Sequence, residues 1–366
     1  MSVVDTKLIY SSSPLLPFVQ DINALYITDS NTTALLKASE NYSPSIPHIE
    51  LNSGEEHKNL QNIEKILKKA IEVKINRNGR FIGVGGGVVL DMTGFAASVY
   101  MRGIDSIYVP TTLLAMVDAA IGGKTGVDFQ KIKNIVGAFH LPKEVYICSD
   151  YLNSLNAVQY KSGLAEMLKI ALINRPALYH TLCKHLSEIK EKIDSAPTIG
   201  RATTSIEWIK EAIEGKMEIV AKDFDEKHER MYLNFGHTFA HALEAALDFS
   251  DVTHGEAVAW GISRSLSLGV LLGKTEEKYR DEVVSLIASL GYSSDPIPQQ
   301  FKKKLLEKTM CKDKSNAFNA IASLLIEKMK CDKKNKSKKI CLVLQKQMGY
   351  TFTEEVDESY IKEVLI

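Results

Sequence analysis

The sequence predicts an α/β domain followed by a mostly helical domain. In the first part of the chain, short apolar segments such as residues 24–28 and 81–84 run into polar or glycine-rich turns, and helical patterns follow. Alternation of this kind is typical of a parallel sheet covered by helices. From Leu155 onward, apolar residues recur mostly with a helical period. We therefore expect an α/β domain over residues 1–153 and a helical domain over residues 154–366.

The composition is that of a globular protein without an unusual charge. The 366 residues are 45% hydrophobic and 25% charged, and Lys+Arg and Asp+Glu both number 45. This balance argues against a nucleic-acid or membrane-surface partner. No apolar run reaches the length of a membrane span, and the first residues lack the pattern of a secretory signal. The 5 cysteines form no C-x-x-C pair, which favours reduced thiols in a cytoplasmic protein.

The first predicted strand covers residues 24–28 and ends at Asp29 and Asn31, where a helix is expected to follow up to Ala38. Ligands of α/β domains bind at the carboxyl ends of strands. From the sequence alone, however, helix capping is the favoured role of these two polar residues. A polar loop over residues 53–58 then precedes an amphipathic helix over residues 59–73.

The second predicted strand begins at residue 81 and runs into Gly85, Gly86 and Gly87, after which a helix carries Asp91. Such a turn lets backbone N–H groups approach a phosphate at a helix N-terminus. Tight packing is the alternative, and the strict G-x-G-x-x-G spacing is absent. We expect a valine at Gly86 to fill the space for a pyrophosphate and to resist a positive φ. Asp91, one turn into the helix, would cap it or reach a ligand.

A third strand is predicted over residues 105–110, followed by an apolar helix that contains Asp118. A lone buried acid needs a partner, so we expect Asp118 to be functional or ion-paired. The sequence Gly122-Gly123-Lys124 resembles the end of a Walker A loop, but the first glycine is missing, which excludes a P-loop. Lys124 and Lys133 could contact an anion, although solvated lysines are the default.

The helical half of the chain contains an acid and a base inside a strongly apolar segment. Glu166 and Lys169 are three residues apart and therefore share a helix face. They form either a structural ion pair or a metal-ligating carboxylate beside an ammonium group. A longer helix around Trp208 carries Lys216, further helices are expected over residues 275–330, and a basic loop over residues 331–339 precedes a strand over residues 340–344.

The most informative stretch covers residues 233–244, which we interpret as a single two-faced helix. His237, His241 and Glu244 share one face, and apolar residues including Phe239 and Leu243 occupy the other. Imidazoles at i and i+4 can bind one metal ion, although surface or core histidines are the alternative. Because 3 of the chain's 9 histidines lie between residues 237 and 254, a metal site is favoured.

Taken together and in order, these segments resemble the 3-dehydroquinate synthase family. The likeness runs from about residue 29 to residue 344, and its motifs are specific in combination rather than singly. The segments that carry it are residues 85–91, 101–103, 110–118, 121–128, 133–139, 162–169, 233–238 and 254–256.

The resemblance implies a dinucleotide-binding α/β domain with tightly held NAD and a mostly helical domain with a catalytic zinc or cobalt ion. It implies Glu166, His237 and His254 as the metal ligands, and it places His241 near the reacting groups instead of on the metal. Three protein ligands leave a coordination position open for substrate.

The resemblance also implies the residues that contact the two small molecules. The cofactor contacts are Asp29, Asn31, Ser53, Gly54, Glu55, Glu56, His57, Lys58, Gly87, Val88, Val89, Leu90, Asp91, Thr111, Thr112, Lys124, Lys133, Tyr151, Leu152, Asn153 and Ser154. The residues on the substrate side are Arg102, Asp118, Lys124, Asn134, Lys169, Lys216, Arg230, Asn234, His241 and the loop of Asp332, Lys333 and Lys334.

The activity implied is conversion of 3-deoxy-D-arabino-heptulosonate 7-phosphate to 3-dehydroquinate and phosphate, the second step of the shikimate pathway. The resemblance further implies a homodimer. A related sugar-phosphate cyclase and a glycerol-dehydrogenase-like oxidoreductase using NAD and a metal are the alternatives. A binding protein without enzymatic activity is disfavoured by the intact ligand set.

Overall fold

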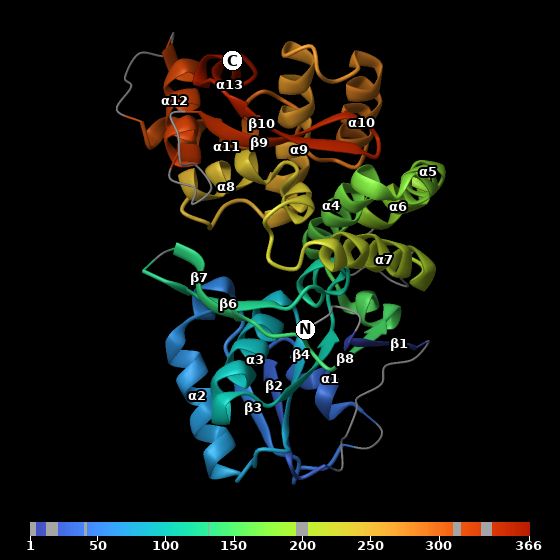
Figure 1. Ribbon diagram of the computed structural model, residues 1–366, viewed down its shortest axis with the longest axis vertical. Helices are drawn as coiled ribbons and strands as arrows, with labels where there is room; N and C mark the ends of the chain where they lie inside the picture. Colours follow the sequence, from blue (N-terminus) through green and yellow to red (C-terminus); the bar gives the residue numbers. More distant parts are fainter. Residues whose placement is uncertain are drawn as a thin grey trace. The chain divides into compact units, whose positions relative to one another are not determined.

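A computed structural model of the chain describes residues 5–11, 21–39, 42–130, 132–194, 204–309, 316–330 and 339–366. Contacts divide the chain into two compact units (Figure 1). Unit 1 comprises Met1–Gly163 and Ser195–Phe224, and unit 2 comprises Leu164–Asp194 and Asp225–Ile366. This division differs from the predicted boundary at residues 153 and 154. Among the described residues, no helix is long and apolar enough to cross a membrane.

The described part of unit 1 contains a parallel sheet of 6 strands in the order β1-β8-β5-β4-β2-β3. Its interior strands are almost fully buried and rich in β-branched and aromatic residues, as strands covered on both faces require. The predicted strands at residues 24–28, 81–85 and 105–110 are confirmed. The strand bounds are β1 (Lys7–Ser11), β2 (Ala24–Asp29), β3 (His48–Leu51), β4 (Arg80–Gly85), β5 (Asp105–Pro110) and β8 (Glu144–Cys148).

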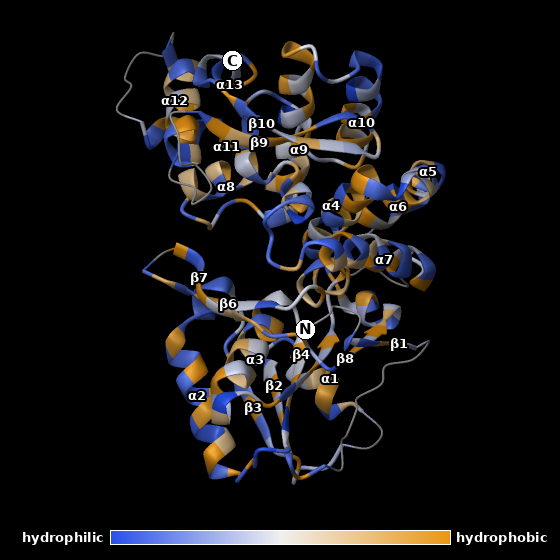
Figure 2. Cartoon of the chain, in the orientation of Figure 1, coloured by the Kyte–Doolittle hydropathy of each residue, from blue (hydrophilic) through white to orange (hydrophobic). Residues whose placement is uncertain are grey.

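Helix α2 (Leu60–Glu72) confirms the predicted amphipathic helix. It begins after Asn59, whose side chain accepts a hydrogen bond from the backbone N–H of Asn62. Figure 2 shows hydrophobic and hydrophilic residues alternating along its length, as expected of a helix with one buried face. The other helices of unit 1 are α1 (Thr33–Lys37), α3 (Gly87–Val99) and α7 (Ile206–Lys222).

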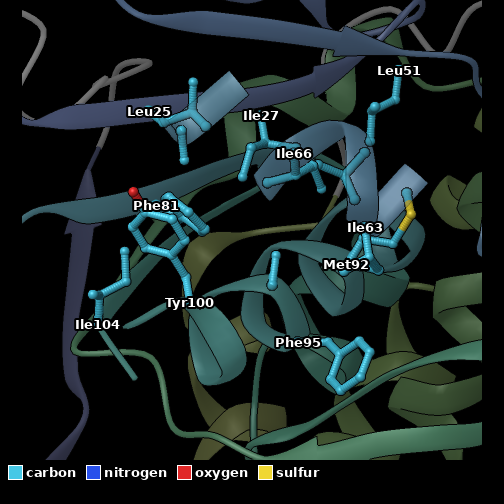
Figure 3. Close-up of a cluster of buried hydrophobic side chains, with 14 of the residues drawn as sticks. Leu25, Ile27, Leu51, Ile63, Ile66, Phe81, Met92, Phe95, Tyr100 and Ile104 are labelled. Atoms are coloured by element: carbon cyan, nitrogen blue, oxygen red, sulfur yellow. The ribbon is translucent and has the colours of Figure 1, made fainter. Parts of the chain in front are cut away.

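The core of unit 1 lies between the sheet and the helices α2 and α3. Ile66 of α2, Met92 of α3 and Phe81 of β4 are fully buried in one cluster (Figure 3). Burial of such side chains contributes about 1.5–3 kcal/mol each. The cluster therefore fixes α3, and with it the glycine turn that joins β4 to α3.

Two features of unit 1 differ from the sequence-based expectation. Strands β6 (Lys124–Phe129) and β7 (Ile132–Phe139) pair antiparallel as a hairpin, which was not predicted. The segment around Asp118 contains a π-helical turn, η4 (Ala115–Ala119), in place of a regular helix. Single π turns of this kind are frequent at functional sites.

Unit 2 is mostly helical in its described part, as predicted, and also contains the predicted strand at residues 340–344. That strand, β9 (Ile340–Gln347), pairs antiparallel with β10 (Tyr350–Val356), which was not predicted. Helix α4 (Ala157–Asn174) begins in unit 1 and continues into unit 2. The other helices of unit 2 are α5 (Pro176–Lys184), α6 (Leu186–Asp194), α8 (His237–Ala246), α9 (His254–Leu271), α10 (Glu277–Ser289), α11 (Gln299–Glu307), α12 (Ala317–Lys330) and α13 (Glu358–Glu363).

Candidate active site

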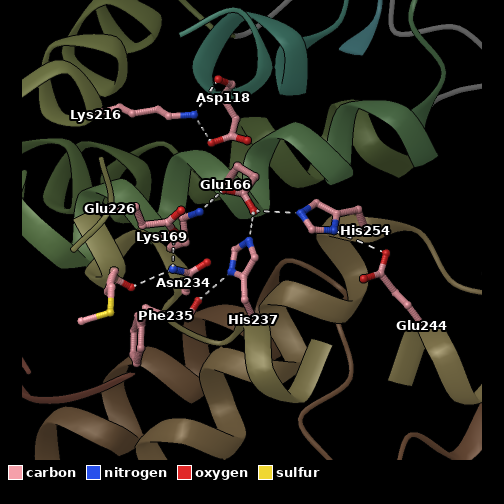
Figure 4. Close-up of polar contacts among 11 residues, drawn as sticks. Asp118, Glu166, Lys169, Lys216, Glu226, Asn234, Phe235, His237, Glu244 and His254 are labelled. Carbon is pink, nitrogen blue, oxygen red and sulfur yellow. Dashed lines mark hydrogen bonds and ion pairs between the residues drawn. The ribbon is translucent and has the colours of Figure 1, made fainter. Parts of the chain in front are cut away.

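Three side chains of unit 2, each on a different helix, form a candidate metal centre (Figure 4). Glu166 lies on α4, while His237 and His254 are the first residues of α8 and α9. The single helix predicted over residues 233–244 is wrong at its start. Residues 233 and 234 belong to a 3-10 helix, η6 (Glu229–Asn234), and α8 begins only at His237. Gly236 then adopts a φ of 80°, and a Cβ there would lie 2.7 Å from the backbone nitrogen of Ile262. Only glycine fits this turn.

The donor atoms of these three side chains converge. One ligand atom each from Glu166, His237 and His254 lies within 4.8 Å of the other two. Glu166 Oε1 is 3.6 Å from His237 Nε2 and 3.4 Å from His254 Nε2. Two imidazoles and one carboxylate suit a divalent ion of the zinc and cobalt type.

The Glu166 carboxylate has the surroundings of a cation ligand. It is 1% exposed, and neither of its oxygens makes a hydrogen bond of normal geometry with the described residues. Its Oε2 pairs with the ammonium of Lys169, which is also buried. A buried carboxylate is costly unless it is paired or bound to a metal. The free side of Glu166, which faces the two imidazoles, therefore fits a metal ion.

Electrostatics keep these ligands in different protonation states. Burial opposes ionisation of Glu166, but Lys169 and His254 outweigh it and lower the pKa of Glu166 to about 2. Burial and the neighbouring positive charge of Lys169 lower the pKa of His237 well below its usual value. Burial acts in the same direction on His254, but Glu244 and Glu166 raise the pKa of His254 to about 10. A metal ion would have to displace the proton from this imidazole.

His241 lies beside the centre without being part of it. Its ring is 5.4 Å from that of His237, edge to face, and 6.4 Å from that of His254, nearly stacked. The side chain is exposed, and its nitrogens are not among the converging ligand atoms found in the described residues. The i,i+4 spacing favoured His237 and His241 as ligands of one metal ion. The geometry instead brings His237 together with Glu166 and His254.

Two further predicted residues, Arg230 and Asn234, lie on η6. Arg230 is almost fully buried. Asn234 Nδ2 donates to Glu226 Oε1 at 3.0 Å and to the backbone oxygen of Met231 at 3.1 Å, which fixes the orientation of its amide. Sequence reasoning missed Glu226, because nothing distinguishes it from the other charged residues of the stretch 223–230.

The glycine turn is the candidate anion site of unit 1. Helix α3 begins at Gly87, and its first N–H groups have no partner within the helix. Gly86 is extended, with a φ of −75°, so the expected need for a positive φ is wrong. A Cβ on Gly86 would lie 3.4 Å from Thr112, whereas one on Gly85 would lie 2.7 Å from Val89. Gly85 thus serves packing, whereas a Cβ on Gly86 would make only an ordinary contact with Thr112.

Lys58 joins two other predicted residues from distant parts of unit 1. Its Nζ lies 2.6 Å from Asp91 Oδ2 and 2.5 Å from Asn134 Oδ1. The side chain is buried, and although burial opposes the charge, Asp91 raises the pKa of Lys58. Asn134 has a φ of 51°, and its N–H donates to Asp128. The ammonium therefore ties the loop before α2 to helix α3 and to the hairpin.

Asp118 has the partner that its position required. Lys216 of α7 donates to Asp118 Oδ1 at 2.7 Å and to its backbone oxygen at 2.6 Å (Figure 4). Both residues belong to unit 1. The π-helical turn presents the carbonyl and the carboxylate of Asp118 to one ammonium group.

At the end of β2, the capping role favoured by the sequence for Asp29 and Asn31 is not observed, because Thr32 is the N-cap of α1 and no side chain caps that helix. Asp29 instead holds the turn that precedes α1. Asp29 Oδ1 accepts hydrogen bonds from the backbone N–H of Asn31 and Thr32 and from the Thr32 hydroxyl. The Ser30 hydroxyl donates to Ser53, which links this turn to the loop before α2. That loop contains the short 3-10 helix η2 (Glu55–His57), preceded by Gly54.

The remaining predicted residues lie at several places in unit 1. Met101 and Arg102 both have a positive φ, at 48° and 69°, and Arg102 is exposed. Lys124 begins β6, and Lys133 lies on β7. The other described positions are Val88, Val89 and Leu90 on α3, Thr111 and Thr112 after β5, and Tyr151, Leu152, Asn153 and Ser154 on the 3-10 helix η5 (Ser149–Ser154). Asp332, Lys333 and Lys334 lie outside the described residues.

Comparisons with known families cover both units. A family model described as 3-dehydroquinate synthase N-terminal matches residues 48–162, and one described as 3-dehydroquinate synthase C-terminal matches residues 163–316. A 3-dehydroquinate synthase from Thermoanaerobacter sp. (strain X514) is 36% identical over 353 residues, covering 95% of this chain and 91% of that protein. One from Helicobacter pylori (strain G27) is 34% identical over 317 residues, covering 86% and 82%.

Solved structures share the fold at lower identity. A 2-epi-5-epi-valiolone synthase from Streptomyces hygroscopicus with NAD⁺ and Zn²⁺ bound has a TM-score of 0.79 and 22% identity, covering 98% of this chain and 95% of its own. A 2-deoxy-scyllo-inosose synthase complexed with carbaglucose-6-phosphate, NAD⁺ and Co²⁺ has a TM-score of 0.75 and 24% identity, with the same coverage. A probable glycerol dehydrogenase from Sinorhizobium meliloti has a TM-score of 0.59 and 14% identity, covering 99% and 95%.

Proposed function

The chain belongs to the 3-dehydroquinate synthase family, and we propose that Glu166, His237 and His254 hold the metal ion of its active site. It is an enzyme of the shikimate pathway that converts 3-deoxy-D-arabino-heptulosonate 7-phosphate to 3-dehydroquinate and phosphate, and its cofactors are NAD and Zn²⁺ or Co²⁺. The observation that carries the site assignment is the buried Glu166 carboxylate, whose free oxygen faces two imidazoles.

The residues of unit 2 divide into ligands and their supports. A divalent ion at this place would polarise a substrate hydroxyl oxygen. Lys169 keeps Glu166 ionised by direct pairing, and the three protein ligands leave room for a substrate oxygen. His241 is exposed beside the metal set, where its imidazole is placed to exchange a proton with the substrate.

The glycine turn of unit 1 is the proposed seat of the NAD pyrophosphate. Bound NAD would supply reversible oxidation of one substrate carbon. The N-terminus of α3, residues 87–91, offers backbone N–H groups, and the missing side chain of Gly86 would let a phosphate group approach them. We assign the rest of the cofactor to Asp29, Asn31, the loop of residues 53–58, Thr111, Thr112, Lys124, Lys133 and residues 151–154.

The substrate carries a carboxylate and a phosphate, which require basic and amide donors. Lys58 occupies the Oδ1 atom of Asn134, so the two N–H donors of this amide remain for a carboxylate. Lys124, Lys169 and Arg102 supply positive charge for the phosphate and the carboxylate. Lys216, bound to Asp118, and Arg230 and Asn234 complete the proposed set on the substrate side.

We also propose a cytoplasmic homodimer whose functional domains follow the predicted boundary, residues 1–153 for NAD and residues 154–366 for metal and substrate. Two of the described cysteines, Cys148 and Cys183, are free thiols, which suits a reducing compartment. Size-exclusion chromatography with light scattering would measure the oligomer directly.

The competing function is a polyol dehydrogenase that uses the same fold and releases NADH. In the cyclase the oxidation is reversed within each turnover, so trace NAD should support many turnovers. Phosphate and 3-dehydroquinate should form in equal amounts, without an increase in NADH absorbance at 340 nm. Accumulation of NADH one for one with product would contradict the proposal and favour the dehydrogenase.

A second rival is a cyclase that acts on another sugar phosphate. The same phosphate-release assay with glucose 6-phosphate in place of the heptulosonate phosphate distinguishes the two. We expect turnover of the heptulosonate phosphate alone, because a 2-keto acid carboxylate has a matching donor in the Asn134 amide. Faster turnover of glucose 6-phosphate would reassign the substrate.

A further inference from the structure

We propose that Glu244 is a positioning residue that orients His254 and strengthens it as a metal ligand. This inference rests on the proposed metal centre and extends it by one residue that the sequence did not assign to it. Glu244 is 2% exposed, and its Oε1 lies 3.4 Å from Nδ1 of His254 (Figure 4).

The two nitrogens of His254 face two different carboxylates. Nδ1 faces Glu244, while Nε2 faces Oε1 of Glu166 at 3.4 Å. If His254 held the metal through Nε2, its ring proton would reside on Nδ1, which would donate a hydrogen bond to Glu244. The carboxylate thereby selects the tautomer that presents a lone pair to the metal, and it raises the basicity of the ring.

The second imidazole ligand is supported differently, which gives an internal contrast. Nδ1 of His237 faces the backbone oxygen of Phe235 at 3.2 Å, a neutral acceptor. A negatively charged acceptor stabilises positive charge on the ring more than a carbonyl group does. His254 should therefore be the more strongly donating of the two imidazoles, because Glu244 is the carboxylate against its outer nitrogen.

The fold places Glu244 there through the tight connection from α8 to α9. The backbone oxygen of Glu244 accepts hydrogen bonds from the N–H groups of Leu247 and Phe249, at 3.2 and 2.8 Å. Asp248 and Phe249 both have a positive φ, at 52° and 58°, so the chain reverses within a few residues. Thr253 then caps α9 and sets His254 as its first residue.

The test compares Glu244→Gln with a matched control, Glu256→Gln. Glu256 lies two residues after His254 on α9, and its Oε1 accepts from Gln300 instead of from a metal ligand. Competition of each purified protein against a chromophoric chelator for Zn²⁺ measures metal affinity. We expect Glu244→Gln to weaken Zn²⁺ binding by about 10–100-fold and Glu256→Gln to leave it unchanged.

Two further readouts separate ligand orientation from a structural effect. The visible absorption bands of the Co²⁺-loaded protein should shift in Glu244→Gln and stay fixed in Glu256→Gln. NAD affinity, which depends on unit 1, should be the same in both. In the Zn²⁺-loaded wild-type protein, ¹⁵N NMR should find the ring proton of His254 on Nδ1. This measurement needs no variant and therefore does not depend on how Glu244→Gln folds.

The outcomes distinguish this inference from the proposed metal centre. Retention of Zn²⁺ by His254→Ala would contradict the metal centre itself. If His254→Ala loses Zn²⁺ while Glu244→Gln keeps wild-type affinity and an unshifted Co²⁺ spectrum, the role of Glu244 is wrong and the centre stands. A metal bound at Nδ1 of His254 would also overturn the inference.

Discussion

The glycine turn of unit 1 and the imidazole set of unit 2 bind their proposed ligands by opposite means. At the turn between β4 and α3, the donors are backbone N–H groups and the essential feature is the missing side chain of Gly86. At the proposed metal centre, Glu166, His237 and His254 would bind through side-chain atoms, and the backbone only places them. We therefore expect ligand binding at the turn to be lost when a larger side chain is introduced, and ligand binding at the metal centre to be lost when a side chain is shortened.

The difference also determines how each site relates to its neighbourhood. Gly85 is packed against Val89, and the next residue, Gly86, belongs to the proposed anion site. A residue needed for folding and a residue proposed for binding are therefore adjacent in the chain. At the proposed metal centre, Lys169 pairs with Glu166 and Glu244 pairs with His254, so charged neighbours contact two of the three ligands. Substitutions at the turn should therefore show that NAD binding can be lost without loss of folding. Substitutions at the metal centre should show that metal binding can be lost without loss of NAD binding.

The largest effect is expected for His254→Ala. Two remaining protein ligands hold zinc poorly, so metal affinity and activity should each fall by about 1,000-fold or more. Metal analysis of the purified protein and the phosphate-release assay measure the two losses. The control is His185→Ala, whose ring pairs with Glu188 in the same unit and should retain metal. A variant at His254 with stoichiometric zinc would mean that the wrong histidine was chosen, and His241 would become the candidate.

The next effect is expected for Gly86→Val. The fold should persist, because the added Cβ finds only an ordinary contact with Thr112 and the backbone is already extended. NAD affinity should fall by about 100-fold, since the side chain occupies the space proposed for the pyrophosphate. Calorimetry with NAD measures this.

Gly85→Val is the companion variant to Gly86→Val. Its Cβ would lie 2.7 Å from Val89, so we expect a loss of about 1–3 kcal/mol in unfolding free energy. If Gly86→Val is folded and binds NAD with unchanged affinity, the assignment of the pyrophosphate site to this turn is wrong.

The substitution Lys58→Met tests the buried ion pair of unit 1, and the smallest effect of all is expected for its control, Lys68→Met. Burial already raises the pKa of Asp91, and the variant removes the ammonium that favours its charged form, so the free energy of unfolding should fall by about 3 kcal/mol. Urea denaturation measures this. Lys68→Met, which removes an exposed lysine paired with Glu64 on the same helix, should change stability by less than about 0.5 kcal/mol. Equal effects of the two substitutions would mean that Lys58 is not structurally important.

Strongly periodic elements were predictable, and irregular ones were not. Helix α2 and strands β4 and β5 match their predicted bounds within about two residues, because their apolar periods agree with their burial. The hairpin β6–β7 was missed, because β7 exposes much of its length and lacks a clean alternation. The break at Gly236 was missed because residues 233–244 keep a helical period through a glycine that adopts a positive φ.

The candidate site could be predicted only in part from residue spacing. The i,i+4 rule favoured His237 with His241, because both lie on one helix, whereas the geometry brings together residues that are 71 and 17 positions apart, namely 166, 237 and 254. Proximity of that kind arises from helix packing and leaves no local pattern. The same holds for Glu226 and Glu244, whose roles depend on neighbours that only the fold supplies.

The ammonium of Lys58 is shared between Asp91, next to the proposed cofactor, and Asn134, next to the proposed substrate. A shared group of this kind makes the two ligands thermodynamically dependent on each other. If bound NAD draws Lys58 into a fixed position, the Asn134 amide is held ready for the substrate carboxylate before the substrate arrives. The linkage is reciprocal, so substrate should slow the departure of NAD by stabilising the same arrangement. We expect binding to follow an order, with NAD first and last, and expect Lys58→Met to make that order random.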